Sequence, residues 1–466
     1  MGMACFIIVV VAILMIAMAL SRKRGLDPST AIVKLDEYPM ITVVMCCKGT
    51  HENSLSNFKR NLSMQYPGKV EFLFVAESED DPAVACARQA IEESNLNTEN
   101  RKTDIVIAGL SFHNAQKVHN MLFGVAYSDP ESKYVLFADD DVFFYPGLIE
   151  ELVDPLIKYP DNILVSTGYE FIVPPPGGNV FDYCLMIYRL HNLFSFITPR
   201  PILCWGGCWM STLSVFRENF NNLIDCYLDG GYSDDTIISL LVQQRGYVCA
   251  HPFRAIFPNV VSKKISFRKY WEFMTRQFFV TDTYATNFNK RVNHSLAFLI
   301  CSSIWLMIIW ISIAPVSGSL AILASIFGDF KFNLAGKLGI VSIFLWIFMT
   351  ETIKNAMKTM AKVSNQQRPP EQHVKIELNR FKIFLGIAIH TFLMPISVVY
   401  IMLSNSIVWA GVRYYKKNGK IVKVERKGSD GRPYSVPFEN SIARTLSNPK
   451  MSELVNFNSQ IHFQQV

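Results

Sequence analysis

The chain has 466 residues, half of them hydrophobic, and its mean hydropathy is positive. This apolar content is too high for an ordinary soluble enzyme, and the length leaves room for more than one domain. The net charge of +6 at pH 7 is concentrated beside the apolar segments, where it suits anionic lipid head groups. No basic stripe with interleaved aromatic residues is present, so a nucleic-acid partner is not expected.

The first apolar segment predicts a membrane anchor. Residues 3–20 contain no charged side chain, and Arg22, Lys23 and Arg24 follow at once. A helix needs about 20 apolar residues to cross a bilayer. No small-residue cleavage site follows, which favours a retained signal-anchor over residues 1–24 rather than a cleaved signal peptide. The basic flank then places the chain from residue 25 onward in the cytosol.

Residues 40–290 alternate between strand and helix patterns. Short apolar runs bounded by polar residues predict buried strands at 41–47, 70–77, 104–110 and 134–138. Helices are expected near 54–64, 82–94 and 114–126. This alternation predicts an α/β domain whose sheet is covered on both faces. Each strand runs into a polar cluster, and open α/β sheets bind ligands outside the carboxyl ends of their strands.

Three consecutive aspartates, Asp139, Asp140 and Asp141, end the fourth predicted strand. In an extended chain the side chains alternate, so Asp139 and Asp141 would project to one side. Two carboxylates on one side form a hard-oxygen site for Mg²⁺ or Mn²⁺. An EF-hand is excluded because Phe144 stands where that loop needs glycine. A solvated acidic loop or a helix N-terminus is the alternative.

Further acids follow two other predicted elements. Glu77 and Asp81 end the second strand, where a nucleoside could be held, although Asp81 could instead cap the helix that opens at Pro82. Asp234 and Asp235 begin an amphipathic helix after two glycines. Acids favour a helix N-terminus in any case, but a carboxylate on a rigid element also suits a general base.

The region 291–412 predicts membrane helices, at 294–318, 333–349 and 381–411. The last of these runs is too long for one straight span and too short for two. Pro395 would kink it, or one end would lie in the membrane interface. Residues 413–466 are expected to form a basic polar tail, and the side of the membrane on which it lies stays open.

Six motifs occur in a characteristic order: EFLFVAESEDDPA, AGLSFHNAQKVHN, KYVLFADDDV, CWGGCWM, DGGYSDD and SFRKYWEFMTRQFFVTDTY. In this order they resemble the ceramide glucosyltransferases of glycosyltransferase family 21, most closely the plant type. The resemblance covers residues 40–290 and the membrane layout. It implies a GT-A fold, the fold of nucleotide-diphospho-sugar transferases. It also implies metal-dependent, inverting transfer of glucose from UDP-glucose to ceramide, with the catalytic domain on the cytosolic face of Golgi or endoplasmic reticulum membranes.

The resemblance also assigns roles to individual acids. It implies that Glu77 and Asp81 bind the nucleotide. Asp139 and Asp141 would form the DxD pair that meets the metal and the diphosphate, and Asp235 would be the catalytic base.

The last family motif, usually Q-x-x-R-W, corresponds here to Phe273, Arg276 and Gln277. Arg276 remains to meet the diphosphate, whereas the glutamine and the tryptophan are missing, which leaves the acceptor contacts open. Alternatively, residues 265–280 form an interfacial helix whose arginines reach lipid phosphates.

Three more residues are candidates for substrate contacts. Trp205 and Trp209 flank two glycines and would line the acceptor entrance, or else belong to the core or to an interfacial belt. Lys117, like Lys48, would neutralise the diphosphate, or else be an ordinary solvated lysine.

Two alternative functions fit part of the sequence. A processive membrane polysaccharide synthase, or another lipid or sterol glycosyltransferase, would share the domain and the spans. A transporter or sensor with a domain that binds nucleotide sugars would need ionisable residues inside the membrane. Such residues are few in the predicted spans, Lys337 and His390 among them.

Overall fold

The computed structural model describes residues 37–95, 100–192, 203–261, 263–295 and 334–455, with a few separate positions between 297 and 323. The predicted signal-anchor at residues 3–20 lies outside the described residues, as does most of the predicted span at 294–318. Both remain predictions.

A mixed seven-stranded sheet forms the core, in the order β3-β2-β1-β4-β7-β5-β8. Four neighbours run parallel: β1 (Ile41–Cys46), β2 (Val70–Ala76), β3 (Arg101–Ile107) and β4 (Tyr134–Asp139). The rest are β5 (Ile163–Thr167), β7 (Cys208–Thr212) and β8 (Val248–Ala250), with β7 antiparallel to both β4 and β5. The order 3-2-1-4 reverses direction between β1 and β4, and α/β sheets bind ligands at such a switch point.

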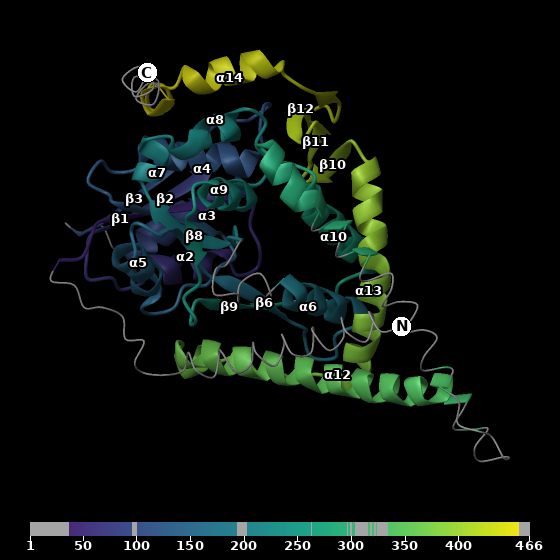
Figure 1. Cartoon of the computed structure of the whole chain (residues 1–466). Helices are drawn as coiled ribbons and strands as arrows, with labels where there is room; N and C mark the ends of the chain where they lie inside the picture. The colour runs from purple at the N-terminus through teal and green to yellow at the C-terminus, as the bar shows by residue number, and fades with distance from the viewer. Residues whose placement is uncertain are drawn as a thin grey trace.

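Helices cover both faces of this sheet (Figure 1). One face packs against α2 (Ser54–Leu62), α3 (Pro82–Ser94) and α5 (Leu148–Lys158). The other packs against α4 (Gln116–Tyr127), α8 (Leu223–Leu228) and α9 (Asp234–Gln244), with the short α7 (Ser214–Arg217) beside them. Successive side chains of a strand point to opposite faces, so Val43 belongs to the first core and Val44 to the second. Burial of both faces is the reason these strands read as continuous apolar runs, and the predicted α/β class is confirmed.

The third strand begins at Arg101, earlier than the predicted start at residue 104. β3 is the edge strand of the sheet, and its polar side chains Arg101 and Thr103 are partly exposed. An edge strand with alternating polar residues carries no continuous apolar run. The hydrophobic pattern therefore predicted only the second half of β3 as strand. The strand ends before Gly109, whose φ of +79° turns the chain.

A second layer extends the domain on the side of β5. It contains a two-stranded sheet of β6 (Tyr169–Val173) and β9 (Ile256–Val260), together with α6 (Val180–Asn192) and α10 (Phe267–Thr281). Two long helices, α12 (Leu334–Gln366) and α13 (Arg380–Leu403), pack against this layer. In Figure 1, α13 stands along α6 and α10, and α12 crosses below them.

Among the described residues, α13 alone is long and apolar enough to cross a membrane, and half of its most apolar stretch is buried against the protein. The predicted span at 333–349 falls in the first half of α12. The predicted run at 381–411 is corrected by the structure. Its helix ends at Leu403 and the chain turns into strand β10 (Ser406–Trp409), because the polar residues Ser404 and Asn405 interrupt the apolar pattern. The excess length is therefore strand rather than a second helix.

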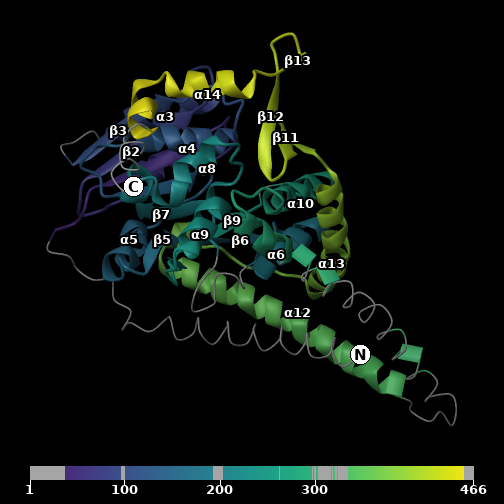
Figure 2. The same ribbon diagram turned by 45° about the horizontal axis from the view of Figure 1, so that its top comes forward.

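The C-terminal region is not the simple polar tail that the sequence predicted. It forms a four-stranded antiparallel sheet, the C-terminal sheet: β10, β11 (Val412–Lys417), β12 (Lys420–Lys427) and β13 (Pro433–Tyr434), followed by α14 (Phe438–Leu446). Asn418 and Gly419 join β11 to β12, both at positive φ, as the tight two-residue hairpin turn requires. Figure 2 shows this sheet between α13 and α14.

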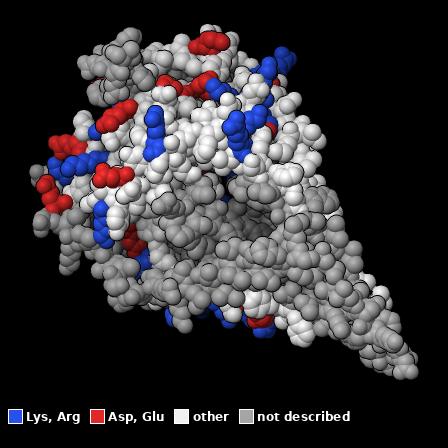
Figure 3. Space-filling model, in the orientation of Figure 1, with Lys and Arg blue, Asp and Glu red and all other residues white. Residues whose placement is uncertain are grey.

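Three basic residues of the C-terminal sheet pair with acids of the α/β domain. Lys416 pairs with Asp282, Lys420 with Asp229, and Arg426 with Glu77. Elsewhere on the face shown in Figure 3, basic and acidic side chains alternate over the α/β layers. The charges that predicted a tail therefore attach the C-terminal sheet to the domain.

Candidate active site

A cavity of about 420 Å³ opens at the carboxyl ends of β1 and β4. The two strands are parallel neighbours, and Cys46 lies opposite Asp139 in their register. The lining also includes the first turn of α4, the loop before β7, the start of α9, one side of α10 and part of the C-terminal sheet. The site thus lies at the switch point of the sheet, where the sequence predicted a ligand.

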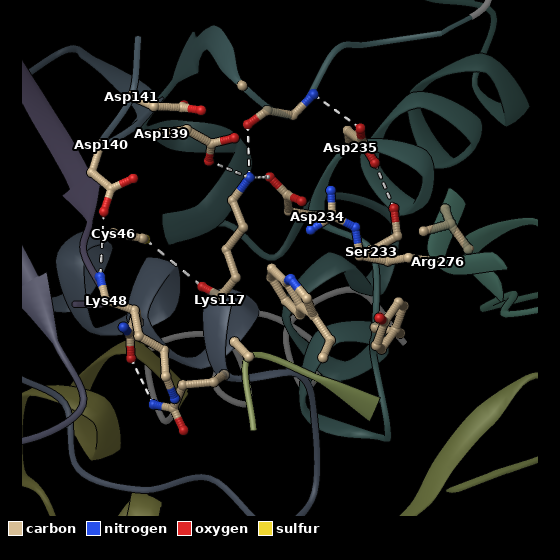
Figure 4. A pocket seen from close by; sticks show the side chains of 18 of the residues that line it. Cys46, Lys48, Lys117, Asp139, Asp140, Asp141, Ser233, Asp234, Asp235 and Arg276 are labelled. Atoms are coloured by element: carbon tan, nitrogen blue, oxygen red, sulfur yellow. Dashed lines mark hydrogen bonds and ion pairs between the residues drawn. The ribbon is translucent and has the colours of Figure 1, made fainter. Parts of the chain in front are cut away.

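Lys117 occupies the centre of this pocket (Figure 4). Its ammonium group lies 2.7 Å from Asp139 Oδ1 and 3.2 Å from Asp234 Oδ2, and it donates a hydrogen bond to the carbonyl oxygen of Gly206 at 2.8 Å. Burial lowers the pKa of Lys117, but the carboxylates of Asp139 and Asp234 outweigh it and raise the pKa well above its usual range. Lys117 is therefore a fixed cation inside the pocket, and the solvated-lysine alternative is wrong.

All three aspartates of the triplet line the pocket. Strand β4 ends at Asp139 and the chain then turns. The alternation of side chains expected for an extended chain therefore stops there, and Asp140 also faces the pocket. Asp140 accepts a hydrogen bond from the backbone N–H of Lys48 at 3.4 Å, whereas Asp139 points to Lys117 (Figure 4). Burial and, next, the charge of Asp139 raise the pKa of Asp140 to about 7. This excess of negative charge fits a divalent cation.

Asp234 and Asp235 both face the pocket from the start of α9. Asp235 Oδ1 accepts hydrogen bonds from Ser233 Oγ at 2.5 Å and from Thr236 N at 2.7 Å, and its Oδ2 accepts one from Gly206 N at 2.9 Å. These bonds fix the direction of the carboxylate. Ser233 caps the helix, since its hydroxyl accepts a hydrogen bond from Thr236 N.

Asp234 has different surroundings. It is buried and accepts a hydrogen bond from Trp209 Nε1 at 3.4 Å, in addition to its ion pair with Lys117. Burial raises the pKa of Asp234 to about 6, although Lys117 opposes the shift. The two adjacent acids of α9 therefore have separate partners. Asp234 pairs with Lys117, whereas Asp235 is held by the Ser233 hydroxyl and by backbone N–H groups.

Neither Glu77 nor Asp81 is part of the pocket lining. Glu77 pairs with Lys48 Nζ at 2.7 Å and with Arg426 Nη1 at 3.1 Å. Burial would raise the pKa of Glu77, but these two cations lower it below its usual range. Asp81 caps α3, as the alternative reading expected, and also accepts a hydrogen bond from Gly49 N at 2.7 Å. Nucleotide contacts of both acids remain predictions.

The two tryptophans around the glycine pair differ in position. Trp205 lines the pocket with little of its surface exposed. Trp209 is completely buried, and its ring packs on Phe137 with centroids 4.4 Å apart. The prediction that Trp209 lies at the acceptor entrance is therefore wrong: as a β7 residue it points into the core between β4 and α7. Its indole N–H nevertheless reaches Asp234.

Arg276 lines the pocket from α10. Its guanidinium carbon lies 5.6 Å from the centre of the Phe273 ring and 5.3 Å from that of Trp409. The half-buried side chain thus faces the pocket beside these two rings, as the diphosphate role requires. The interfacial-helix alternative for residues 265–280 stays open.

Sequence reasoning missed three side chains at or beside the pocket: Arg189, Trp409 and Arg426. Arg189 lines the pocket, forms an ion pair with Glu170 and packs on the Phe273 ring at 5.5 Å. No motif of the sequence marked Arg189. The Asn418-Gly419 turn is the signal that could have revealed the C-terminal sheet, and with it Trp409 and Arg426.

Residues 4–172 match the family "Glycosyl transferase family 21", which confirms the predicted resemblance over that range. No curated protein sequence matches the chain significantly. Together with the mixed sheet and its Rossmann-like parallel half, the family match supports a GT-A-like fold.

Solved glycosyltransferases with a similar fold are only distantly related. A mannosyltransferase from Pyrobaculum calidifontis, in complex with GDP-Man and Mn²⁺, is 13% identical, with a TM-score of 0.39 over 76% of this chain and 96% of its own. Glucosyl-3-phosphoglycerate synthase from Mycobacterium tuberculosis, in complex with Mn²⁺ and UDP-Glc, is 11% identical, with a TM-score of 0.30 over 52% and 78%. Likeness at this distance assigns no substrate.

Lys117 provides a test of the pocket's charge balance. The Lys117→Met variant leaves Asp139 and the buried Asp234 without their shared cation, and we expect the free energy of unfolding to fall by about 1–3 kcal/mol. Adding Asp234→Asn should restore part of the loss. Lys59→Met, which breaks the exposed pair with Glu93, should cost less than about 1 kcal/mol. Denaturant unfolding in detergent measures all three, and equal losses for the two lysine variants would contradict a shared buried cation.

Proposed function

We propose that this glycosyltransferase, whose residues 4–172 match family 21, transfers glucose from UDP-glucose to ceramide. The transfer inverts the anomeric carbon and gives glucosylceramide. One observation carries the proposal: three aspartates, Lys117, Asp235 and Arg276 converge on one pocket at the switch point of the sheet. The family resemblance supplies the identity of donor and acceptor, and the pocket supplies groups suited to each step.

The donor's diphosphate is the part of the substrate that needs compensating charge. Arg276 and Lys117 are cations that line the pocket, and Lys48 lies at its edge. Arg276 would stabilise the negative charge that develops on the leaving diphosphate, because guanidinium and phosphate match in charge and hydrogen-bond geometry. Lys117, already held by two carboxylates, would keep the pocket from repelling the donor.

A divalent ion fits the carboxylates of the triplet. Asp139 and Asp141 would hold Mg²⁺ or Mn²⁺, which would also offset the charge of Asp139 that, after burial, raises the pKa of Asp140. In the described part of the chain no three or more His, Cys, Asp and Glu side chains are gathered into a metal cage. The ion would therefore complete its coordination with diphosphate oxygens and water, as Mg²⁺ usually does. When bound, it supplies charge neutralisation to the departing diphosphate.

Asp235 is suited to be the base. Its carboxylate would take the proton of the primary hydroxyl of ceramide while that oxygen attacks the anomeric carbon, and UDP would leave with the electrons of the broken bond. The hydrogen bonds from Ser233, Thr236 and Gly206 hold the carboxylate in one direction. This orientation favours a single angle of attack, as inversion requires.

The acceptor is proposed to arrive from a membrane. Large apolar side chains of α13 are exposed, among them Phe381, Phe392, Tyr400 and Leu403. Exposed apolar surface of this kind is typical of a membrane or partner contact. With the basic residues after the predicted anchor, it supports a catalytic domain on the cytosolic face of a membrane. The family resemblance alone suggests that this membrane belongs to the Golgi or endoplasmic reticulum.

Product analysis tests the substrates. Membranes that carry the protein should convert UDP-glucose and added ceramide into a lipid with the mass of glucosylceramide, and glycosidases of known specificity should identify its linkage as β. Membranes without the protein are the control. A sterol glucoside or a polymer in place of glucosylceramide would reject ceramide as the acceptor, and glucose released only to water would reject a lipid acceptor altogether.

The Asp235→Asn variant tests the base. Asparagine can still accept the hydrogen bonds of Ser233 and Thr236, so the helix start should survive. Loss of the base should lower kcat by about 10²–10⁴-fold. Binding of UDP should stay near wild type, and the melting temperature should fall only slightly, through the lost hydrogen bond from Gly206 N. Asp225→Asn, at an exposed site on α8, is the matched control. An Asp235→Asn enzyme within tenfold of wild-type kcat would show that another group takes the proton.

A further inference from the structure

Arg276 is held between two aromatic rings that come from distant parts of the chain. Phe273 lies one turn earlier on α10, and its ring centre is 5.6 Å from the guanidinium carbon. Trp409 lies at the end of β10, in the C-terminal sheet, and its ring centre is 5.3 Å away. A guanidinium that stacks on aromatic faces keeps its N–H groups free at its edge. The two rings therefore direct those donors into the pocket.

Trp409 reaches the pocket because of the turn that follows it. Ala410 and Gly411 both have positive φ and bring the chain back as β11, so that Trp409 and Val412 are paired at the end of the ladder. Trp409, Ala410 and Val412 all line the pocket. Val408, the preceding residue, points the other way and is exposed, as strand alternation requires.

The C-terminal sheet that carries Trp409 is firmly attached to the α/β domain. The hydroxyl of Tyr414 accepts a hydrogen bond from Gln116 N at 3.4 Å. Lys416 pairs with Asp282 and donates to the carbonyl oxygen of Ile401 at 2.9 Å. These contacts join the sheet to α4, to the end of α10 and to the end of α13, so Trp409 is set in place independently of any ligand.

We propose that Trp409 is a positioning residue, which the C-terminal sheet contributes to the active site to fix the guanidinium of Arg276 for the donor's diphosphate. The inference rests on the proposed function, since the diphosphate is that of the proposed donor. Trp409 acts through Arg276, and the effect of its loss should vanish when Arg276 is already absent.

The experiment measures UDP binding by calorimetry to the full-length protein in detergent with Mn²⁺, followed by kcat and KM for UDP-glucose. Trp409→Ala should weaken UDP binding by up to about tenfold, because the cation–π contact between these two half-buried side chains lies between the exposed and the desolvated case. Trp409→Phe, which keeps an aromatic face, should recover most of the affinity. Trp409→Leu, which keeps apolar bulk without a π face, should not. Val408→Ala is the matched control and should leave UDP binding and the kinetic constants unchanged.

A double-mutant cycle separates positioning from general packing. Arg276→Gln alone and Arg276→Gln with Trp409→Ala should bind UDP equally weakly. Additive losses, or full affinity in Trp409→Leu, would overturn the proposal even if Trp409→Ala proves too unstable to purify. A wild-type protein that does not bind UDP would instead refute the proposed function. Wild-type UDP binding that Trp409→Ala leaves unchanged would refute this inference alone.

Discussion

The pocket depends on one interaction, the ammonium of Lys117 shared between Asp139 and Asp234. It joins the end of β4 to the start of α9 through a side chain of α4, and its third bond holds the loop at Gly206. Carboxylates this close repel one another, and the partly buried lysine lets them share one cavity. The same Gly206 supplies the N–H that orients Asp235. The charge that permits the acids to converge thus also positions the proposed base.

The C-terminal sheet completes the site from the opposite direction. Three of its basic residues pair with acids of the α/β domain, and Arg426 with Glu77 is the most buried of these pairs. Ion pairs of this kind add specificity of docking more than stability. Their consequence here is functional, because the docked sheet carries Trp409 to Arg276. A transferase domain that ended at α10 would lack one wall of its own pocket.

Sequence reasoning succeeded where the local pattern alone determines the structure. The parallel strands are buried on both faces and read as apolar runs, so three of the four were placed almost to the residue, while the edge strand β3 was placed late. The aspartates that end β4 were predictable because ligands bind at the carboxyl ends of the strands. The same argument placed Glu77 and Asp81 less well, since neither lines the pocket. Trp209 and the C-terminal sheet were not predictable, since their positions depend on partners far away in the chain. Strand register decides whether a tryptophan faces a pocket or the core. A basic segment can pack as a sheet against the domain only if acidic side chains lie opposite its basic ones.

A structure of the protein with UDP and Mn²⁺, with the metal located by anomalous scattering, would show whether this pocket binds the donor as proposed. We expect a manganese peak within coordination distance of carboxylates of the Asp139–Asp141 triplet, and a diphosphate that contacts Arg276 beside the Trp409 ring. Lys117 should remain between Asp139 and Asp234 or turn to the phosphate. Manganese bound elsewhere, or a diphosphate with no contact to Arg276, would contradict this proposal.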